Sequence, residues 1–450
     1  MSRTYDSALS HLSLLQSNRA ITALFTPTSP PANLNALAIP EMLAWLQRAG
    51  HTPSSLAATG LRCIHVAGTK GKGSVTTFAA SILSQYPQCR PVGTYTSPHV
   101  VSVRERILIN GAPISKELFS KYFWEVWDRL SEAARKEGDV DPDGPGSKPF
   151  YFRFLTIMAL HVFVREGVKD AVVECGIGGE YDATNVLGGE MVSAAVVTRL
   201  GIDHVSMLGG TVEEIAWHKA GVLKAGVKGF VREAEEGVLE VIRERGREKG
   251  AEVEVVRGEV KVDGARLAGP WTGENMKLAV EAAREHLRKR GVVIEDVPEE
   301  FKTGLREAML RGRCEVLRDS EIEWFVDGAH TVDSLEGVGR WFAEETKGND
   351  AIRVLVFNQQ ERNTAALLGA LFKGAKEGLG RDQIFSHAIL ARNDEQPAKD
   401  GEQRDLAIQA GAKELILTLS QGTLASVHDS VPSAVEKVRA IAAQAQEDGK

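Results

Sequence analysis

The chain of 450 residues carries a formal net charge of −7, with 43% hydrophobic and 26% charged residues. These proportions are typical of a globular protein, and the length predicts two or three domains rather than one. The negative charge argues against a nucleic-acid binder, and no apolar run reaches the length of a membrane span. The four cysteines form no CxxC pair, which fits a reducing compartment. We therefore expect a cytoplasmic protein, and the acid-poor residues 1–50 leave a mitochondrial pool open.

Helical periodicity is expected first over residues 5–25 and again over residues 40–49, with a proline-containing loop at residues 26–35 between them. A short apolar run at residues 64–67 then predicts a buried strand. This strand leads directly into GTKGKGS, residues 68–74, and into a helical pattern that starts at Val75. Strand, glycine-rich loop and helix thus follow one another without a linker.

This order of elements is one in which proteins hold phosphate groups. Glycines let consecutive backbone N–H groups face one anion, and the positive end of the following helix points at the same place. The spacing differs from the common GxxxxGK[ST] loop, because Lys72 precedes Gly73 and Ser74 follows it directly. We still predict a nucleotide site, in which Lys72 reaches the outer phosphates and Ser74 meets a magnesium ion or a phosphate oxygen.

Short apolar strands and amphipathic helices alternate along the rest of the chain, which predicts an α/β fold with a doubly wound sheet. The alternating segment at residues 100–111 stops at Asn110-Gly111, which is a turn signal. Up to residue 290 we also expect strands at 92–98, 171–175 and 194–198, helices at 115–136, 150–164, 212–223 and 274–290, and smaller αβ units over 224–262.

The pattern breaks between residues 297 and 313 and then restarts, which predicts a domain boundary. We assign residues 1–300 to an ATP-binding P-loop domain, 301–313 to a linker or hinge, and 314–450 to a smaller α/β domain. In the second domain we expect strands at 323–326, 353–357, 387–391 and 414–417, and helices at 334–345, 365–372 and 432–446.

Polar side chains follow two neighbouring predicted strands of the first domain. Glu174 ends one strand, and Asp203 and His204 follow the next. Because ligands of open α/β sheets bind beyond the carboxyl ends of the strands, Glu174 is placed to hold a magnesium ion beside the glycine loop. For His204, a structural role and a ligand role stay equally open. Lys219 lies in a predicted helix, where a lysine is usually a solvated charge, and its spacing alone assigns it no role.

The segment Asp327-Gly-Ala-His330 ends what we expect to be the first strand of the second domain. Side chains at that strand end are placed to face a cleft toward the first domain. This arrangement predicts a nucleotide held from both sides, with Arg313 at the hinge. An arginine suits a developing phosphoryl charge because it presents a rigid fork of donors.

Because several motifs occur together, the chain resembles the folylpolyglutamate synthases, members of the Mur ligase-like family of ATP-dependent amide-forming enzymes. The matching segments run in family order from residue 67 to residue 331, and the last hundred or so residues match only in their α/β pattern. The segments are AGTKGKGS (67–74), TSPH (96–99), VRERILING (103–111), YFRFLT (151–156), ECGIGGEYDATN (174–185), GIDHVSMLGGT (201–211), HKAGV (218–222), GRCE (312–315) and DGAHT (327–331).

The resemblance implies a P-loop domain like the Mur ligase central domain and a role for each matching residue. Lys219 corresponds to a lysine that becomes carbamylated. The implied catalytic residues are Lys72, Lys219, Arg313 and His330. ATP contacts are implied for Thr69, Lys70, Gly71, Lys72, Gly73, Ser74, Asn275, Arg313 and Asp327. The implied magnesium ligands are Ser97, Glu174 and His204, and the implied folate-side residues are Pro98, His99, Phe152 and Asp182.

The implied reaction joins L-glutamate to the γ-carboxylate of tetrahydrofolate through an acyl phosphate, with release of ADP and phosphate. ATP is then a substrate, Mg²⁺ is the cofactor, and a monovalent cation is allowed for. We expect small molecules as the partners, no nucleic acid and no membrane, and a monomer.

Two alternatives stay open. Dihydrofolate synthase, or a bifunctional enzyme, would use the same site with dihydropteroate as the acceptor, although Lys70 and YFRFLT favour polyglutamylation. A regulatory P-loop NTPase would not need the set of Glu174, His204, Lys219 and the second-domain DGAH. Lys70 and the Glu180-Tyr181 pair are similar to the eukaryotic branch of the family, whereas the segment before Asn275 lacks an expected histidine.

Overall fold

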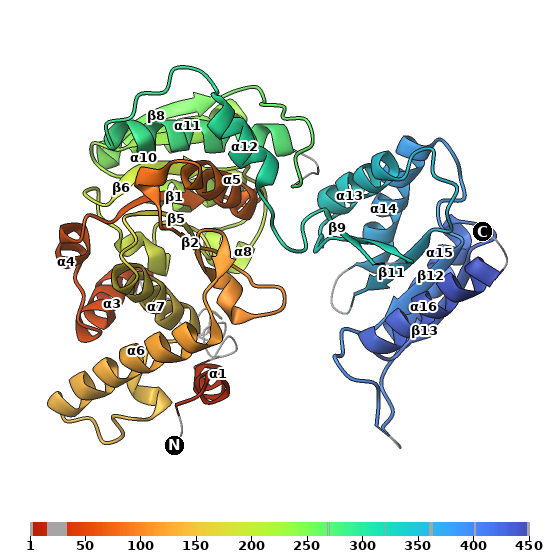
Figure 1. The fold of residues 1–450 in the computed structure, drawn as a ribbon, viewed down its shortest axis with the longest axis horizontal. Coiled ribbons are helices and arrows are strands. Elements are labelled where there is room, and N and C mark those ends of the chain that lie inside the picture. Colours follow the sequence, from red (N-terminus) through yellow and green to blue (C-terminus); the bar gives the residue numbers. More distant parts are fainter. Residues whose placement is uncertain are drawn as a thin grey trace. The chain divides into compact units, whose positions relative to one another are not determined.

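The computed structural model describes residues 3–15, 34–267, 269, 271–319, 321–359, 363–399 and 402–447, without the side chains of residues 34–36. The chain forms two compact units, Met1–Arg266 with Trp271–Leu310, and Leu267–Pro270 with Arg311–Lys450 (Figure 1). Within the described residues, no helix combines the length and the apolar character needed to cross a membrane.

An eight-stranded sheet forms the centre of the first unit, in the order β4-β3-β2-β5-β1-β6-β7-β8. Neighbouring strands from β2 to β8 in this order run parallel, whereas β3 is antiparallel to β2 and β4 to β3. The predicted doubly wound α/β fold is confirmed. The strands are β1 Arg62–Ala67, β2 Val92–Tyr95, β3 Ile107–Ile109, β4 Ala112–Pro113, β5 Asp170–Glu174, β6 Val192–Val197, β7 Lys228–Arg232 and β8 Glu252–Val256.

Helices cover both faces of this sheet. Figure 1 shows α5, α11 and α12 on one face and α3 and α7 on the other. The helices are α1 Tyr5–Leu14, α3 Leu34–Arg48, α4 Pro53–Ala58, α5 Lys72–Ser84, α6 Lys116–Lys136, α7 Tyr151–Arg165, α8 Val205–Leu208, α9 Val212–Lys219, α10 Glu236–Lys249, α11 Thr272–Lys289 and α12 Glu299–Glu307. Short 3-10 turns, η1 to η5, lie at Pro87–Cys89, Val103–Arg106, Pro145–Ser147, Ala183–Val186 and Ala220–Val222.

Two features of the first unit differ from the pattern expected from the sequence, and part of that pattern lies outside the described residues. The helix α3 begins at Leu34 and not at residue 40, so Pro40 lies inside it. Only the end of the alternating segment 100–111 is a strand, because Val103–Arg106 forms a 3-10 turn, although the predicted turn at Asn110-Gly111 is confirmed by positive φ values of 50° and 77°. The part of the predicted first helix beyond residue 15, and residues 26–33 of the predicted loop, lie outside the described residues.

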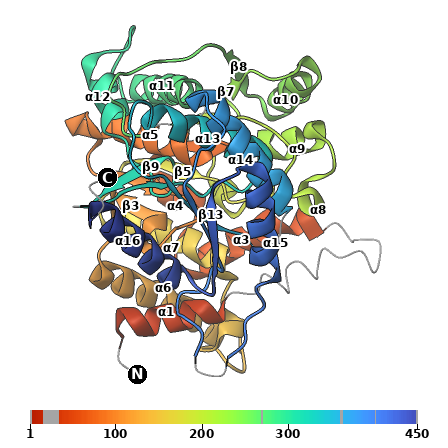
Figure 2. The same ribbon diagram turned by 90° about the vertical axis from the view of Figure 1, so that its right-hand side faces the viewer.

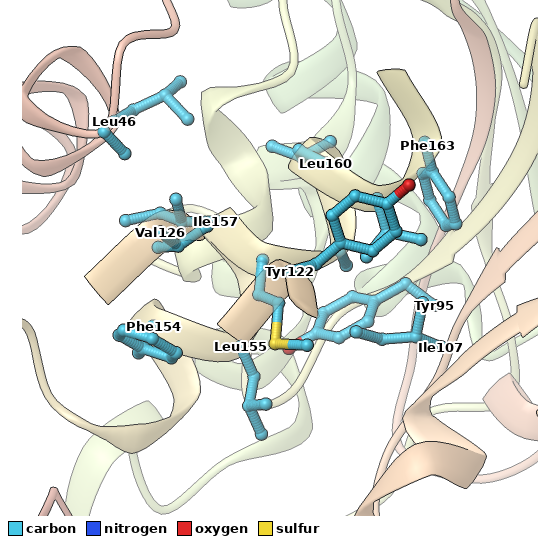
Figure 3. Close-up of a cluster of buried hydrophobic side chains, with 14 of the residues drawn as sticks. Leu46, Tyr95, Ile107, Tyr122, Val126, Phe154, Leu155, Ile157, Leu160 and Phe163 are labelled. Carbon is cyan, nitrogen blue, oxygen red and sulfur yellow. The ribbon is translucent and has the colours of Figure 1, made fainter. Parts of the chain in front are cut away.

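A large apolar core lies between the sheet and the helices α3, α6 and α7. Figure 3 shows its centre, where side chains from these three helices meet those of β2 and β3. Burying each large apolar side chain contributes roughly 1.5 to 3 kcal/mol, so this layer fixes β2 and its neighbours rigidly. The labelled residues are Leu46, Tyr95, Ile107, Tyr122, Val126, Phe154, Leu155, Ile157, Leu160 and Phe163.

The second unit contains a parallel sheet in the order β11-β12-β13 and an antiparallel pair, β9 and β10. Figure 1 labels β9, β11, β12 and β13, and Figure 2 shows β13 with α15 and α16 on either side of it. Along β12, Ala388 and Leu390 pack against α14 and α15, and the alternate residues Ile389 and Ala391 pack against α16. The elements are β9 Glu315–Arg318, β10 Glu323–Val326, α13 Val332–Glu345, β11 Val354–Asn358, α14 Thr364–Leu379, β12 His387–Ala391, α15 Ala407–Leu419, β13 Leu424–His428 and α16 Val431–Glu447.

Two predictions for the second unit are wrong. Residues 414–417 are not a strand but part of α15, in which Ala412 and Ile416 are buried one helical turn apart, and the third strand is β13. A short apolar run is compatible with either element, which explains the error. The strand Glu323–Val326 is not the first of its unit, because β9 precedes it and pairs with it.

Candidate active site

The glycine loop joins β1 to α5 at the carboxyl edge of the sheet, and the predicted order of strand, loop and helix is confirmed. Gly71 is the N-cap of α5, with a left-handed φ of 87° that favours glycine. It has no side chain to cap the first turn of the helix, which starts at Lys72. Such a helix start attracts an anion through its backbone N–H groups and its dipole.

The end of β6 holds the first half of the loop. The backbone N–H groups of Thr69 and Lys70 both donate to the carbonyl oxygen of Arg199, at 3.0 Å each. The hydroxyl of Thr198 donates to the carbonyl oxygen of Lys70 at 2.7 Å. A Cβ atom on Gly68 would lie 1.8 Å from this Thr198 oxygen, so only glycine fits there. The protein itself therefore sets the shape of the loop.

Two lysines share one carbonyl oxygen at the base of the loop. Lys72 Nζ and Lys219 Nζ donate to the oxygen of Gly68, at 3.1 and 2.8 Å. Lys219 is only 2% exposed. Burial, and secondly the charge of Lys72, lowers the pKa of the Lys219 amine from 10.5 to about 7. A large fraction of this amine is therefore uncharged at neutral pH, and Lys219 is not the solvated charge that a lysine in a helix usually is.

Glu174 lies at the end of β5, and its side chain points at the glycine loop. It is 3% exposed, and its Oε2 accepts hydrogen bonds from the Thr96 hydroxyl and, at 3.2 Å, from the backbone N–H of Ser97. A Cβ atom on Gly73 would lie 3.8 Å from the same oxygen. The fold thus brings the carboxylate, the segment after β2 and the first turn of α5 together.

Of the three predicted magnesium ligands, Ser97 and Glu174 are in contact. His204 is the N-cap of α8, its side chain is 44% exposed, and its Nε2 lies 3.8 Å from Asp203 Oδ2. Across the described part of the chain, no group of three or more His, Cys, Asp or Glu side chains is arranged to hold a metal ion. Nevertheless, a carboxylate and a hydroxyl beside a phosphate-binding loop fit Mg²⁺, which prefers oxygen ligands and keeps several waters.

Asn275 lies beside the loop, although about two hundred residues separate them in the sequence. It is 8% exposed on α11, and a Cβ atom on Gly71 would lie 2.5 Å from its Oδ1. The absence of a side chain at Gly71 therefore lets α11 approach the start of α5. Asn275 is placed where the resemblance expects a nucleotide contact, and the contact itself stays a prediction.

Three predicted folate-side residues lie on the segment that follows β2 and on α7. Pro98 is exposed, and His99 Nδ1 accepts a hydrogen bond from Arg106 Nε at 2.9 Å. Burial, and secondly the Arg106 charge, lowers the pKa of His99. The ring of Phe152 lies 5.9 Å from that of Tyr95, between their centroids. These residues line one region beside the end of β2.

Asp182 is buried, and its carboxylate accepts hydrogen bonds from residues of the turn in which it lies. It accepts hydrogen bonds from the N–H groups of Gly176, Ile177 and Thr184, at 2.9, 3.0 and 2.9 Å, and from the Thr184 hydroxyl at 2.5 Å. Burial raises the pKa of this carboxyl, whereas the hydrogen bonds lower it. In this structure Asp182 shapes the turn that follows Glu174, and a direct contact with folate stays a prediction.

The predicted residues of the second unit, Arg313, Asp327 and His330, lie in two segments that are bonded to each other. The Asp327 carboxylate accepts hydrogen bonds from the backbone N–H groups of Cys314 and Ala329, at 2.7 Å each. These bonds fix the segment after Arg313 against the one that leads to His330. The roles of the three residues in catalysis stay predictions.

The similarity to known proteins agrees with this geometry. No protein-family model matches the chain. The folylpolyglutamate synthase of Neurospora crassa is 40% identical over 404 residues, which cover 87% of this chain and 75% of that protein. A folylpolyglutamate synthase of Saccharomyces cerevisiae, strain FostersO, is 39% identical over 396 residues, which cover 85% of this chain and 71% of that protein. The chain belongs to the folylpolyglutamate synthase family.

Solved structures of folylpolyglutamate synthases share the two-unit fold. The crystal structure of the Thermotoga maritima protein has a TM-score of 0.67 and 24% identity, covering 95% of this chain and 92% of that one. The Mycobacterium tuberculosis protein complexed with ADP has a TM-score of 0.68 and 22% identity, covering 90% of this chain and 89% of that one. These similarities confirm the predicted Mur ligase-like fold class.

Sequence reasoning does not single out two threonines that hold the site together. Thr96 bonds to Glu174, and Thr198 bonds to the glycine loop. In the structure both directly follow a strand, β2 and β6. A search for hydroxyls at predicted strand ends would have found Thr198, but not Thr96, which lies inside the predicted strand 92–98. No local pattern reveals the contact of Lys219 with Gly68, because β6 and other elements separate them in sequence.

Proposed function

We propose that the chain is an ATP-dependent ligase that adds L-glutamate to the γ-carboxylate of tetrahydrofolate and so builds a polyglutamate tail. The observation that carries this proposal is the uncapped start of α5, with two lysines at the base of its loop and the Glu174 carboxylate beside it. A phosphate-binding loop beside a carboxylate suits transfer of a phosphoryl group from magnesium-bound ATP. Membership of the folylpolyglutamate synthase family supports the choice of acceptor.

In this proposal the glycine loop holds the phosphates of ATP. Backbone N–H groups from Gly71 to Ser74 face the phosphate oxygens, with Thr69 and Lys70 shaping the loop. Asn275 of the first unit and Arg313 and Asp327 of the second contact the nucleotide. We also keep the assignment of residues 1–300 and 314–450 to an ATP-binding and a C-terminal domain, joined by residues 301–313.

Ser97, Glu174 and His204 would hold Mg²⁺ in the same proposal. The bound ion supplies positive charge against the phosphate oxygens. Lys72 and Arg313 add fixed positive charge while a γ-carboxylate oxygen of folate bonds to the γ-phosphorus and ADP leaves. The uncharged Lys219 amine is the form that adds carbon dioxide to become a carbamate, and His330 lies near the phosphates.

The second half of the reaction forms the amide bond. The amine nitrogen of glutamate bonds to the acyl carbon, phosphate leaves, and the nitrogen loses a proton. Exclusion of water protects the acyl phosphate from hydrolysis. Pro98, His99, Phe152 and Asp182 belong to the folate side of this site. The enzyme acts as a monomer in the cytoplasm, with a mitochondrial pool, and a monovalent cation assists it.

The test compares acceptors. Phosphate release is measured with Mg-ATP and glutamate, with tetrahydrofolate or dihydropteroate, and product masses are read in parallel. Glutamate units added to tetrahydrofolate, with dihydropteroate inert, are the expected result. Turnover with dihydropteroate alone would make the chain a dihydrofolate synthase with the same site. Phosphate release that is indifferent to both acceptors would favour a regulatory NTPase and overturn the proposal.

A further inference from the structure

A stacked pair of side chains, Arg199 and Trp271, lies beside the glycine loop and has no role in the reaction proposed above. Arg199 follows β6, and Trp271 is the N-cap of α11. The guanidinium carbon of Arg199 lies 4.1 Å from the centroid of the Trp271 ring. A cation over an aromatic face at this distance is attracted by the ring, more strongly where water is excluded.

Each partner of this stack is also connected to the loop. The carbonyl oxygen of Arg199 accepts the N–H groups of Thr69 and Lys70, which form the first half of the loop. Trp271 starts the helix whose Asn275 packs against Gly71, at the end of the loop. The stack therefore joins the two elements that hold the opposite ends of the loop.

The backbone of Trp271 gives independent evidence that its place is determined by its surroundings. It adopts a φ of 64°, in the left-handed region that bulky side chains rarely occupy. Such a conformation is unfavourable for a bulky residue and persists only where neighbouring contacts compensate for it. The stack with Arg199 is a contact of this kind. Trp271 also stands in the segment before Asn275 that departs from the family pattern.

We propose that the Arg199–Trp271 stack is a positioning pair for ATP: it keeps the glycine loop in the shape that presents its N–H groups to the phosphates. This inference rests on the proposed function only in that the loop binds ATP. Fixing the residues of a flexible loop costs conformational entropy, so a loop that is ordered before ATP arrives binds it more tightly. Neither side chain needs to contact the nucleotide.

The test measures ADP affinity by calorimetry in the full-length protein, together with steady-state kinetics. Arg199→Met and Trp271→Leu remove one partner each, and the double variant removes both. Trp271→Phe keeps an aromatic face, and Trp271→Asn keeps a residue that tolerates the left-handed backbone but removes the ring. Arg48→Met is the matched control, because it removes a similar stack on Trp45, at 4.6 Å within α3.

Each single loss is expected to raise the Kd for ADP and the KM for ATP about three- to tenfold, with the KM for glutamate changed less than twofold. The double variant should bind ADP no more weakly than the weaker-binding single variant, since either single substitution already removes the whole stack. The Kd of Trp271→Phe for ADP should be close to that of wild type, and the Kd of Trp271→Asn close to that of Trp271→Leu. The Kd of Arg48→Met should equal that of wild type. The variants should lose affinity for ADP and for IDP by the same factor, because these nucleotides differ only in the base.

Other results overturn the inference. If Trp271→Leu weakens binding and Arg199→Met does not, or if the loss differs between ADP and IDP, the ring acts on the base and not on the loop. Additive losses mean that the two side chains act separately. If only the melting temperature falls and ADP affinity is unchanged, the pair is structural. If wild type binds no ADP, the proposed function fails together with the inference.

Discussion

Replacing Lys219 with methionine is expected to abolish ligation and yet to stabilise the first unit. Lys219 is 2% exposed, and burial, with the charge of Lys72, lowers the pKa of its amine from 10.5 to about 7. The unfolded chain restores the ordinary pKa. Between pH 10.5 and 7 the unfolded state therefore binds more protons than the folded one, and stability is lost as the pH falls through this window.

The size of this effect follows from the same shift. At about 1.36 kcal/mol for each pH unit, the cost of burying the lysine approaches roughly 4 to 5 kcal/mol near pH 7 and is complete below it. Methionine has a similar length and no charge, so it removes this cost, but it also removes the hydrogen bond to Gly68, which is worth about 1 kcal/mol. The expected net gain in unfolding free energy is about 3 kcal/mol at pH 7 and close to zero at pH 10.

The assay is urea unfolding at pH 7, 8, 9 and 10, followed by tryptophan fluorescence, because Trp217 lies two residues from Lys219. The buffers are freed of carbon dioxide, since a carbamate would change the charge at this position. Lys136→Met, at an exposed lysine of α6 paired with Glu132, is the control and should differ from wild type by less than about 1 kcal/mol throughout. The reasoning would be refuted if Lys219→Met were less stable than wild type at pH 7. It would also be refuted if the difference in unfolding free energy between the two proteins did not shrink as the pH rises.

Three further predictions concern the glycine loop and its neighbours. Thr96→Val should raise the Mg²⁺ concentration needed for tight ADP binding about five- to tenfold, because Glu174 loses the hydroxyl that orients it. Thr96→Ser keeps a hydroxyl and should bring this concentration back to the wild-type value. Calorimetric Mg²⁺ titrations that are equal for the two variants would contradict the prediction. Glu174→Ala should lower phosphate release more than a thousandfold with an unchanged circular dichroism spectrum, and near-normal turnover would remove Glu174 from the site. Gly68→Ala places a Cβ atom 1.8 Å from Thr198 Oγ1 and should weaken ADP binding more than tenfold, whereas Gly111→Ala, also at a positive φ but in open space, should leave it unchanged.

The parts of the fold that contiguous residues determine could be predicted from the sequence. The unit of β1, glycine loop and α5 was found because the apolar run, the glycines and the helical period adjoin one another. Helix α6 was found because its apolar face repeats at helical spacing, and the structure adds that Ser115 caps its first turn. The strand His387–Ala391 coincides with its prediction, since it is a short buried run between two helices.

The errors and omissions arise where distant residues decide the outcome. The apolar run at 414–417 is helical because Ile416 packs under α14 together with Ala412, and the run itself does not reveal this. The strand β9 is paired with β10 in a two-stranded antiparallel sheet, and no pattern within residues 315–318 reveals this partner. The contact of Asn275 with Gly71 can be predicted only when the order of the strands in the sheet is known. The periodicity of apolar residues in the sequence does not give that order.

The two borders of the large sheet have a consequence for how this protein resists aggregation. At one border, β4 has two residues and one of them is Pro113, which has no N–H group to offer an incoming strand. At the other border, β8 carries Glu252 and Glu254, which pair with Lys228 at 3.6 and 2.6 Å. An added strand would have to bury these charges or lose a backbone bond, and both are unfavourable. Sheet-to-sheet polymerisation is therefore disfavoured at both ends, and the protein can carry a wide parallel sheet without exposing a template for fibres.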